Sequence, residues 1–432
     1  ESEEGIGSLT LGGFLREVAA RFADREAIAF HEPDGGVRRL TYGGLEAAAR
    51  ATAKALVAVG LDKGTRVALL MGNRPEWVAA AFGVGLAGGV LVPVNTFFEA
   101  AEVRHVLGHS DAGVVLHERQ LAGHDYEDRL RALQPELPYL RRRVCLGTPE
   151  GDDFMAVGQE VADAELEARA AAVSPFDDAL VIYTSGSTGV PKGVLHAHRA
   201  AALQSWRFAR LLLLDPSVRV WSAFPFFWTA GFCMVMGATL AAGGCLVLQE
   251  VFEPGEALRL LESERVTTPH AWPHQLAELE AHPRWLETDL SSLRQVVAFT
   301  SFGRHPSVRV GDVWSSRAAY GLTETFTVVS SSPADTPPDE RDGNEGDILP
   351  GNFVRIVDRQ TGEPLPAGAA GEIRVKGTTL MKGYLKVAPE DVFDADGFFP
   401  TGDAGFVDGR GKLHWVGRTS DLIKTGGANV SP

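Results

Sequence analysis

The sequence predicts an α/β protein with two doubly wound αβα subdomains, each built on a mainly parallel sheet, and a small antiparallel, β-barrel-like subdomain. Two observations carry this prediction. Apolar, β-branched runs alternate with helical segments over most of the chain, and short strands with Gly, Pro and Asp turns follow from about Asp347. The length of 432 residues agrees, because domains contain roughly 150 residues.

The first part of the chain alternates helices and strands. Residues 11–22 carry apolar side chains at helical spacing, and residues 41–60 predict a helix capped by the hydroxyl of Thr41. Residues 66–95 then predict strand, turn, helix and strand, which is a βαβ unit, and residues 112–118 predict a further strand. Such apolar strands are typical of a parallel sheet with helices on both faces.

The middle of the chain continues in the same style. Residues 179–187 predict a buried strand that runs into a glycine-rich loop, residues 196–214 predict a helix, and residues 294–303 predict a later strand. The uncharged segment 220–249 is long enough to cross a bilayer. Because glycines and Pro225 interrupt it, we expect a loop, a buried helix near 231–242 and a strand at 245–248 in place of a membrane span.

The last part predicts antiparallel strands. Asp408-Gly409 lies between two alternating runs, which indicates a hairpin. The expected strands cover 353–358, 371–377 and the two arms of 405–418. We therefore expect four units: a first α/β subdomain at 1–175, a second with the glycine-rich loop at 176–345, a small β subdomain at 346–417 and a hinge at 418–432.

Composition argues against several classes of function. The net charge is -15 and there is no long basic run, which argues against nucleic acid, because Lys and Arg supply most of that affinity. The three cysteines form no C-x-x-C pair, so neither a disulfide framework nor a zinc site is indicated. The first ten residues have no basic or apolar region typical of a signal peptide. A cytoplasmic protein is the simplest expectation.

The stretch "YTSGSTGVPKG", Tyr183 to Gly193, has the composition of a phosphate-binding loop. Glycines let backbone N–H groups turn inward, hydroxyls donate hydrogen bonds, and Lys192 supplies a positive charge. It is not a Walker loop, because Pro191 precedes the lysine where that motif has glycine. A flexible Ser-Gly turn is the alternative reading of these residues taken alone.

Further motifs accompany the loop in order along the chain. They are "YGLTE" at 320–324, "GEIRVKG" followed by "MKGYL", "PTGDAGF" with the T-G-D triplet at 401–403, and "GRTSDLIKTGGANVSP". With these motifs the chain resembles the class I adenylate-forming superfamily, which includes acyl-CoA synthetases, aryl-CoA ligases, luciferases and adenylation domains. The resemblance extends from about Leu9 to Pro432.

The resemblance implies an ATP- and Mg²⁺-dependent enzyme with a two-step reaction. A carboxylate would attack the α-phosphate of ATP to give an acyl-adenylate and pyrophosphate, and the thiol of CoA would then take the acyl group and release AMP. Lys192 would bind the β- and γ-phosphates. The catalytic set would be Thr184, Lys192, Thr323 and Glu324, with Glu324 and Thr184 as metal ligands.

The resemblance also implies a nucleotide site in which Tyr320 lies near adenine and Asp403 accepts from the ribose hydroxyls. Read alone, Tyr320 is a core residue, Asp403 a turn residue, Arg418 a surface arginine and Glu324 an acid at a helix start. The implied nucleotide-binding set is Thr184, Ser185, Gly186, Ser187, Thr188, Gly303, Tyr320, Gly321, Thr323, Asp403 and Arg418.

The implied acyl pocket is mostly apolar. It contains no acidic residue near "FPFFWTAGF" to pair with a substrate ammonium group, so we expect a non-amino acid of a fatty, aryl, alicyclic or terpenoid kind. Trp228 stands where the family usually has histidine, and it either narrows the pocket or forms an apolar wall; a plain core tryptophan is the alternative. The implied pocket residues are Phe227, Trp228, Phe232, Ser301, Phe302 and Gly321.

Two further departures from the family affect the expectation. The segment Thr300 to Pro306 replaces a more glycine-rich family segment and carries Arg304 and His305. The sequence stops just past the hinge residue Asp421, whereas the family continues into a C-terminal lid that carries a lysine for adenylation. We therefore expect this chain to correspond to the large N-terminal domain, to bind nucleotide and to adenylate weakly alone.

Alternatives remain open from the sequence. One is an acyl-adenylate ligase that loads a carrier protein, or a luciferase-like oxygenase, and another is a non-catalytic nucleotide- or acyl-binding protein. The expected partners are a small carboxylic acid, ATP and CoA, with a carrier protein and a homodimer left open, and without nucleic acid or a membrane span.

Overall fold

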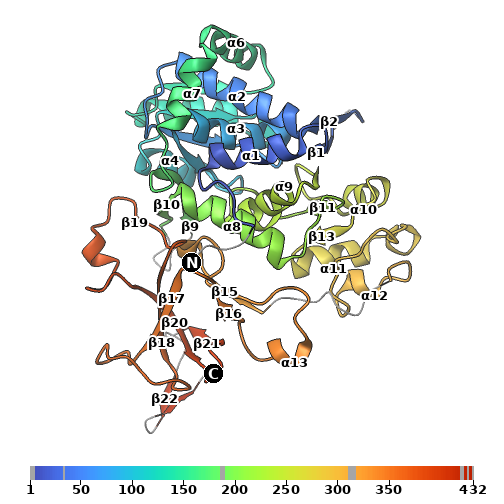
Figure 1. The fold of residues 1–432 in the computed structure, drawn as a ribbon. Helices are drawn as coiled ribbons and strands as arrows, with labels where there is room; N and C mark the ends of the chain where they lie inside the picture. The colour runs from blue at the N-terminus through green and yellow to red at the C-terminus, as the bar shows by residue number, and fades with distance from the viewer. Residues whose placement is uncertain are drawn as a thin grey trace.

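A computed structural model describes residues 5–32, 35–184, 190–309, 318–418, 423–425 and 428–430 of the chain. Two α/β sheets with their helices occupy the upper part of the view in Figure 1, and a β-rich part formed by the last third of the chain lies below them. This arrangement confirms the predicted α/β class with a separate antiparallel part.

The larger sheet carries the glycine-rich loop. Within the described ranges it has seven strands in the order β19-β10-β9-β4-β3-β5-β8. Strands β9, β4, β3, β5 and β8 run parallel to one another, whereas β10 joins antiparallel to β9 and β19 antiparallel to β10 at one edge. The strands are β3 (Arg66–Leu70), β4 (Val90–Pro93), β5 (Val114–His117), β8 (Arg142–Cys145), β9 (Asp178–Thr184), β10 (Lys192–Ala197) and β19 (Gly383–Tyr384).

The second sheet has five strands among the residues described, in the order β13-β11-β12-β1-β2. Its strands are β1 (Glu26–His31), β2 (Val37–Thr41), β11 (Arg219–Ser222), β12 (Cys245–Leu248) and β13 (Thr268–His270). Strand β1 pairs in parallel with β12, so that Ile28 lies opposite Leu246. Each sheet thus takes strands from both of the ranges 1–175 and 176–345, and the boundary at 175 does not divide the sheets.

The sheets interleave because the apolar strand β1 is an inner strand, with β12 on one edge and β2 on the other. Its residues Ala27 to Phe30 are all buried. The hydroxyl of Tyr42 also donates to the carbonyl of Gly244 at 2.7 Å, which ties the start of the next helix to the turn before β12. Local hydrophobic patterns do not contain this pairing, because a strand's partner is set by tertiary packing.

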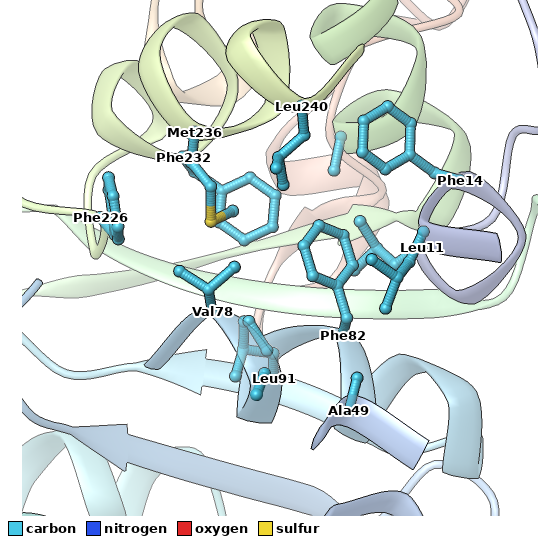
Figure 2. Packing of buried hydrophobic residues seen from close by; sticks show 14 of the residues in the cluster. Leu11, Phe14, Ala49, Val78, Phe82, Leu91, Phe226, Phe232, Met236 and Leu240 are labelled. Carbon is cyan, nitrogen blue, oxygen red and sulfur yellow. The ribbon is translucent and has the colours of Figure 1, made fainter. Parts of the chain in front are cut away.

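The main hydrophobic core lies between helices that cover the sheets. The helix α3 is buried along almost its whole length, which is typical of a helix that is apolar all round. Figure 2 shows Phe226, Phe232, Met236 and Leu240 facing Val78 and Phe82 across this core. Its main helices are α1 (Leu11–Phe22), α2 (Tyr42–Ala58), α3 (Pro75–Ala87), α8 (His198–Leu211), the π-helix Ala230–Gly237 and α9 (Ala238–Ala242).

Side-chain caps and peripheral helices complete the α/β part. The predicted cap at Thr41 is confirmed, since its side chain accepts from the N–H of Gly44. The other α-helices of this part are α4 (Ala100–His109), α5 (Tyr126–Leu133), α6 (Pro149–Val157), α7 (Asp163–Ala171), α10 (Pro254–Ser263), α11 (Pro273–Ala281) and α12 (Ser301–Arg304), whereas α13 (Pro338–Arg341) lies between β15 and β16 of the β-rich part.

The β-rich part contains an antiparallel sheet in the order β17-β18-β20-β21. The predicted hairpin is confirmed: the N–H of Asp408 donates to the carbonyl of Lys412 at 3.0 Å between β20 and β21. The strands of this part are β17 (Asn352–Val357), β18 (Gly371–Gly377), β20 (Phe399–Val407), β21 (Leu413–Arg418), β14 (Ala319–Tyr320), β15 (Ser330–Ser331) and β16 (Asp347–Ile348). Short pairs are β6 (Gln120–Leu121) with β7 (His124–Asp125), and β22 (Ile423–Thr425) with β23 (Ala428–Val430).

Two sequence expectations have different outcomes. The reading of 220–249 is confirmed, with helix over 230–242 and strand over 245–248, and no helix of the described chain has both the length and the apolarity to cross a membrane. The strand expected at 294–303 is wrong: this described segment forms turns and α12. The chain turns away after Gln295, whose side-chain amide donates to the carbonyl of Leu213 at 2.9 Å, and Thr300 caps α12.

Candidate active site

The two ends of the glycine-rich loop lie side by side on the larger sheet. Thr184 ends β9, Lys192 begins β10, and the two residues are paired across the antiparallel ladder. The chain therefore leaves and re-enters the sheet at one point; the sequence predicted the strand before the loop but not β10 after it. The predicted phosphate-binding residues Ser185, Gly186, Ser187 and Thr188 lie outside the described residues.

Three polar or charged side chains from distant parts of the chain meet near this point. The hydroxyl of Tyr384 donates to Oε1 of Glu324 at 2.6 Å, and the Nζ of Lys192 lies 5.3 Å from the centre of the Tyr384 ring. Burial raises the pKa of Tyr384 above its ordinary value, and the Glu324 carboxylate raises it further. The structure thus brings the predicted cation and the predicted metal ligand together around a neutral tyrosine.

A buried histidine forms a hydrogen bond with the turn that carries Thr323 and Glu324. His196, on β10, is fully buried, and its Nε2 lies 2.8 Å from the carbonyl oxygen of Thr323. Burial lowers the pKa of His196 to about 3, so the ring is neutral at pH 7 and its Nε2–H donates to this carbonyl. The ring of Phe326 packs edge-on against it at 4.9 Å.

Two predicted glycines are required by close approach of the chain to itself. A Cβ at Gly321 would lie 1.5 Å from the carbonyl oxygen of Thr327. Thr327 itself has a φ of 92°. A Cβ at Gly303 would lie 2.4 Å from the carbonyl oxygen of Val297. Both glycines therefore have a local structural role, and their contacts to a nucleotide stay predictions.

Tyr320, Asp403 and Arg418, which the family resemblance assigns to the nucleotide site, form a second polar group. The hydroxyl of Tyr320 donates to Oδ2 of Asp403 at 2.8 Å, and the Nε of Arg418 lies 3.2 Å from Oδ1. Asp403 and Arg418 are brought together because they are paired between β20 and β21. Burial raises the pKa of Tyr320, and the neighbouring Asp403 carboxylate adds to the rise, so the hydroxyl stays a donor.

The Asp403 carboxylate is almost completely buried, with an exposed fraction of 2%. Its backbone N–H donates to the hydroxyl of Thr401, which itself donates to the carbonyl of Ile373 at 2.7 Å. A carboxylate accepts about four hydrogen bonds, so two protein partners leave it able to accept from a pair of neighbouring hydroxyls.

Phe227 and Trp228, from the predicted acyl pocket, lie in an aromatic cluster with Phe97. The ring centres are 5.1 Å apart for Phe227 and Trp228, 5.8 Å for Phe97 and Phe227, and 6.3 Å for Phe97 and Trp228. Asn73 holds the preceding turn, since its Oδ1 accepts from the N–H of Phe226 at 2.9 Å. Phe97 is 64% exposed, so the cluster lies at the surface.

The other predicted pocket residues lie elsewhere in the packing. Phe232 is buried in the main core, as Figure 2 shows. The hydroxyl of Ser301 donates to Glu280 at 2.6 Å, and Phe302 packs against Trp285 at 5.9 Å in a different hydrophobic cluster. The assignment of these three residues to one acyl pocket stays a prediction, and the hinge residue Asp421 lies outside the described residues.

Sequence reasoning missed three residues of this site: Phe97, His196 and Tyr384. A signal existed for His196, because it lies four residues after Lys192 on β10, and every second side chain of a strand points to the same face. Tyr384 belongs to the quoted stretch "MKGYL", but its position beside Glu324 depends on the pairing of β19 with β10. No local pattern places Phe97 beside Trp228.

The chain matches known proteins over almost its whole length. Residues 15–385 match the AMP-binding enzyme family. A methyl-dioxo-octahydroindenyl-propanoyl:CoA ligase of Rhodococcus jostii is 33% identical over 441 residues, which cover 97% of this chain and 81% of that protein. A feruloyl-CoA synthase of an Amycolatopsis species is 33% identical over 409 residues, which cover 92% of this chain and 77% of that protein.

The fold is similar to that of solved structures. The crystal structure of an anthranilate CoA ligase in complex with anthranoyl-AMP superposes with a TM-score of 0.79. The superposition covers 98% of this chain and 80% of that one at 24% sequence identity. At this identity the likeness concerns the fold, and it agrees with the α/β architecture described above.

Proposed function

This chain belongs to the AMP-binding enzyme family, and from this premise we propose that it activates a bulky, non-amino carboxylic acid with the residues described above. Its class of activity is that of an AMP-forming acid–thiol ligase, an acyl-CoA synthetase that uses ATP and CoA. The proposal concerns the acid, the metal ion and the role of each residue. The observation that carries it is the nearly buried Asp403 carboxylate between Tyr320 and Arg418.

We assign the nucleoside end of ATP to this group. The Asp403 carboxylate would accept from the two ribose hydroxyls, and the half-exposed Arg418 would neutralise its charge and reach toward the phosphates. A buried carboxylate that accepts from charged and neutral donors is geometrically fixed, so it can select a diol. Tyr320 would contact adenine with its ring while its hydroxyl holds Asp403.

We assign the phosphate end to Thr184, Lys192, Thr323 and Glu324. The described residues contain no group of three or more His, Cys, Asp or Glu that could hold a metal ion by themselves. Mg²⁺ nevertheless fits Glu324, because this ion is commonly bound by one or two carboxylates together with substrate phosphates. When bound, Mg²⁺ would neutralise phosphate charge, while Lys192 binds phosphate oxygens and Thr323 approaches the α-phosphate.

The chemistry then requires positioning more than covalent catalysis. The substrate carboxylate attacks the α-phosphorus and pyrophosphate leaves; in the second step the CoA thiol attacks the acyl carbon and AMP leaves. Holding the reacting atoms in line and stabilising charge can supply most of such a rate enhancement. The residues described here bind and orient the nucleotide for the first step.

The proposed acid is bulky and lacks an ammonium group. The exposed Phe97 and the partly buried Trp228, both packed on the buried Phe227, offer aromatic surface and no carboxylate, which favours a planar or cyclic apolar acid. Two similar enzymes support this choice, since one is named for a bicyclic propanoic acid and the other for ferulic acid.

The test uses acyl-sulfamoyl adenosines, which mimic the adenylate and need no reaction. A ligand at 100 times its dissociation constant stabilises the protein by about 2.7 kcal/mol. Because the entropy of unfolding is roughly 2.1 cal/mol/K per residue, the melting temperature of a chain of 432 residues should then rise by about 3 °C. We expect the largest rise in melting temperature with cyclic acyl groups, and loss of the rise in Asp403→Ala. If linear or amino-acyl analogues give the largest rise, the proposed acid class is wrong.

A further inference from the structure

Tyr384 lies between the two groups to which the proposed function assigns the phosphate end of ATP. Its hydroxyl donates to one oxygen of Glu324, and its ring face receives the Lys192 ammonium group. Neither the phosphate loop nor the "YGLTE" stretch contains this residue. It is contributed by β19, which joins the edge of the larger sheet after a long excursion through the β-rich part.

The backbone around Tyr384 is fixed on both sides of the site. Val194 lies opposite Tyr384 in the ladder, and the N–H of Leu385 donates to the carbonyl of Gly193 at 2.8 Å. The N–H of Met381 donates to the carbonyl oxygen of Glu324 at 2.7 Å. The short segment 381–385 is thus bonded at one end to the Glu324 turn and at the other to the strand that begins with Lys192.

The side chain of Tyr384 is suited to orienting a carboxylate. A tyrosine hydroxyl is protonated at neutral pH, so it is a donor to the carboxylate and not a competing anion. It bonds Oε1 of Glu324, which fixes the rotation of the carboxylate and leaves Oε2 for another partner. The ring attracts the lysine through its face, so one side chain constrains both charged groups.

We propose that Tyr384 is a positioning residue for the phosphate end of the site, where it aligns the Glu324 carboxylate for Mg²⁺ and the Lys192 ammonium group for phosphate oxygens. The inference rests on the proposed function, because it needs Glu324 and Lys192 in those roles. Partners that orient a metal ligand typically change metal affinity by about tenfold or more when they are removed.

The test measures binding without turnover. Calorimetry with a non-hydrolysable ATP analogue, with and without Mg²⁺, gives the gain in affinity due to the metal, and AMP reports the nucleoside end separately. In Tyr384→Phe we expect the gain due to Mg²⁺ to fall about tenfold while AMP affinity is unchanged. Tyr139→Phe makes the same chemical change at an exposed position and should leave both quantities as in the wild type.

Two further variants separate the possible failures. In Tyr384→Leu, which also removes the ring face, pyrophosphate affinity without Mg²⁺ should fall as well. In Glu324→Gln the gain due to Mg²⁺ should disappear, and adding Tyr384→Phe should then have no further effect, because the two residues act as one unit.

A wild-type Mg²⁺ gain in Tyr384→Phe, with Glu324→Gln deficient, would overturn this inference and leave the proposed function standing. An unchanged gain in Glu324→Gln would overturn both. If Tyr384→Phe lowered the affinity for AMP as much as it lowered the gain due to Mg²⁺, the residue would have a general structural role, and this would also overturn the inference. The melting temperature of each unliganded variant confirms that binding is measured on folded protein.

Discussion

His196 makes a quantitative prediction about stability in acid. Its pKa is lowered by burial to about 3, whereas an unfolded histidine has a pKa of 6.5. Between these values the unfolded chain binds a proton that the folded chain excludes, so the free energy of unfolding falls as the pH falls from 6.5 toward 3. At pH 4.5, two units below the unfolded pKa, one such histidine costs ~2.7 kcal/mol.

The perturbation is His196→Gln, which keeps an amide donor for the carbonyl of Thr323 but does not titrate. We expect the variant to be less stable than the wild type at pH 7.5, and the difference to shift in its favour by ~2.7 kcal/mol at pH 4.5. Urea unfolding at the two pH values, followed by tryptophan fluorescence, measures this shift. Other buried groups, such as His198, titrate in both proteins and cancel in the comparison.

A matched control is Gln204→Leu. Gln204 is also buried, and its Nε2 donates to the carbonyl of Val328 at 2.7 Å, on the same turn region, but the amide carries no titratable proton. Its loss should cost the same free energy at both pH values. If His196→Gln behaved like this control, with a difference that is constant within ~0.5 kcal/mol, the buried neutral histidine would be the wrong account.

Three other predictions follow from the packing. Gly321→Ala should destabilise by more than about 3 kcal/mol in urea unfolding, because its Cβ would lie 1.5 Å from the carbonyl oxygen of Thr327; wild-type stability would contradict this. Asp403→Ala should weaken AMP binding about 10- to 100-fold by calorimetry, and equal affinity would make it a structural residue only. Burial and Glu250 raise the pKa of Glu118 to about 8, so the free energy of unfolding should fall as the pH rises from 4.5 to 8. Urea midpoints measured at pH 6 and pH 8.5 should therefore differ less in Glu118→Gln than in the wild type, and an equal difference would contradict this.

The features that sequence reasoning predicted are those with local causes. A hydroxyl before an apolar helical run caps the helix at Thr41, and an Asp-Gly pair between alternating strands makes the turn at Asp408. The antiparallel pairing of the two strands that flank this turn places Asp403 beside Arg418. In each case the residues that decide the structure are neighbours in sequence or are joined by one turn.

The features that it did not predict depend on distant contacts. The segment 294–303 has strand-forming residues, but the side chain of Gln295 donates to the carbonyl of Leu213, in the connection that follows α8, and the chain turns away. Tyr384 reaches Glu324 only because β19 joins β10, and a two-residue strand has too short a pattern to reveal its partner. Local propensity is a weak guide wherever tertiary packing decides.

The exchange of strands between the two sheets has a consequence for biosynthesis. Strand β1 leaves the ribosome early, but its parallel neighbour β12 is translated only after the whole larger sheet except β19. Until then β1 can pair only with β2, and the edge that β12 covers stays open; an unpaired strand edge promotes aggregation. We therefore expect nascent chains that end before β12 to bind chaperones strongly, and folding to complete late, as the long sequence separation of these contacts implies.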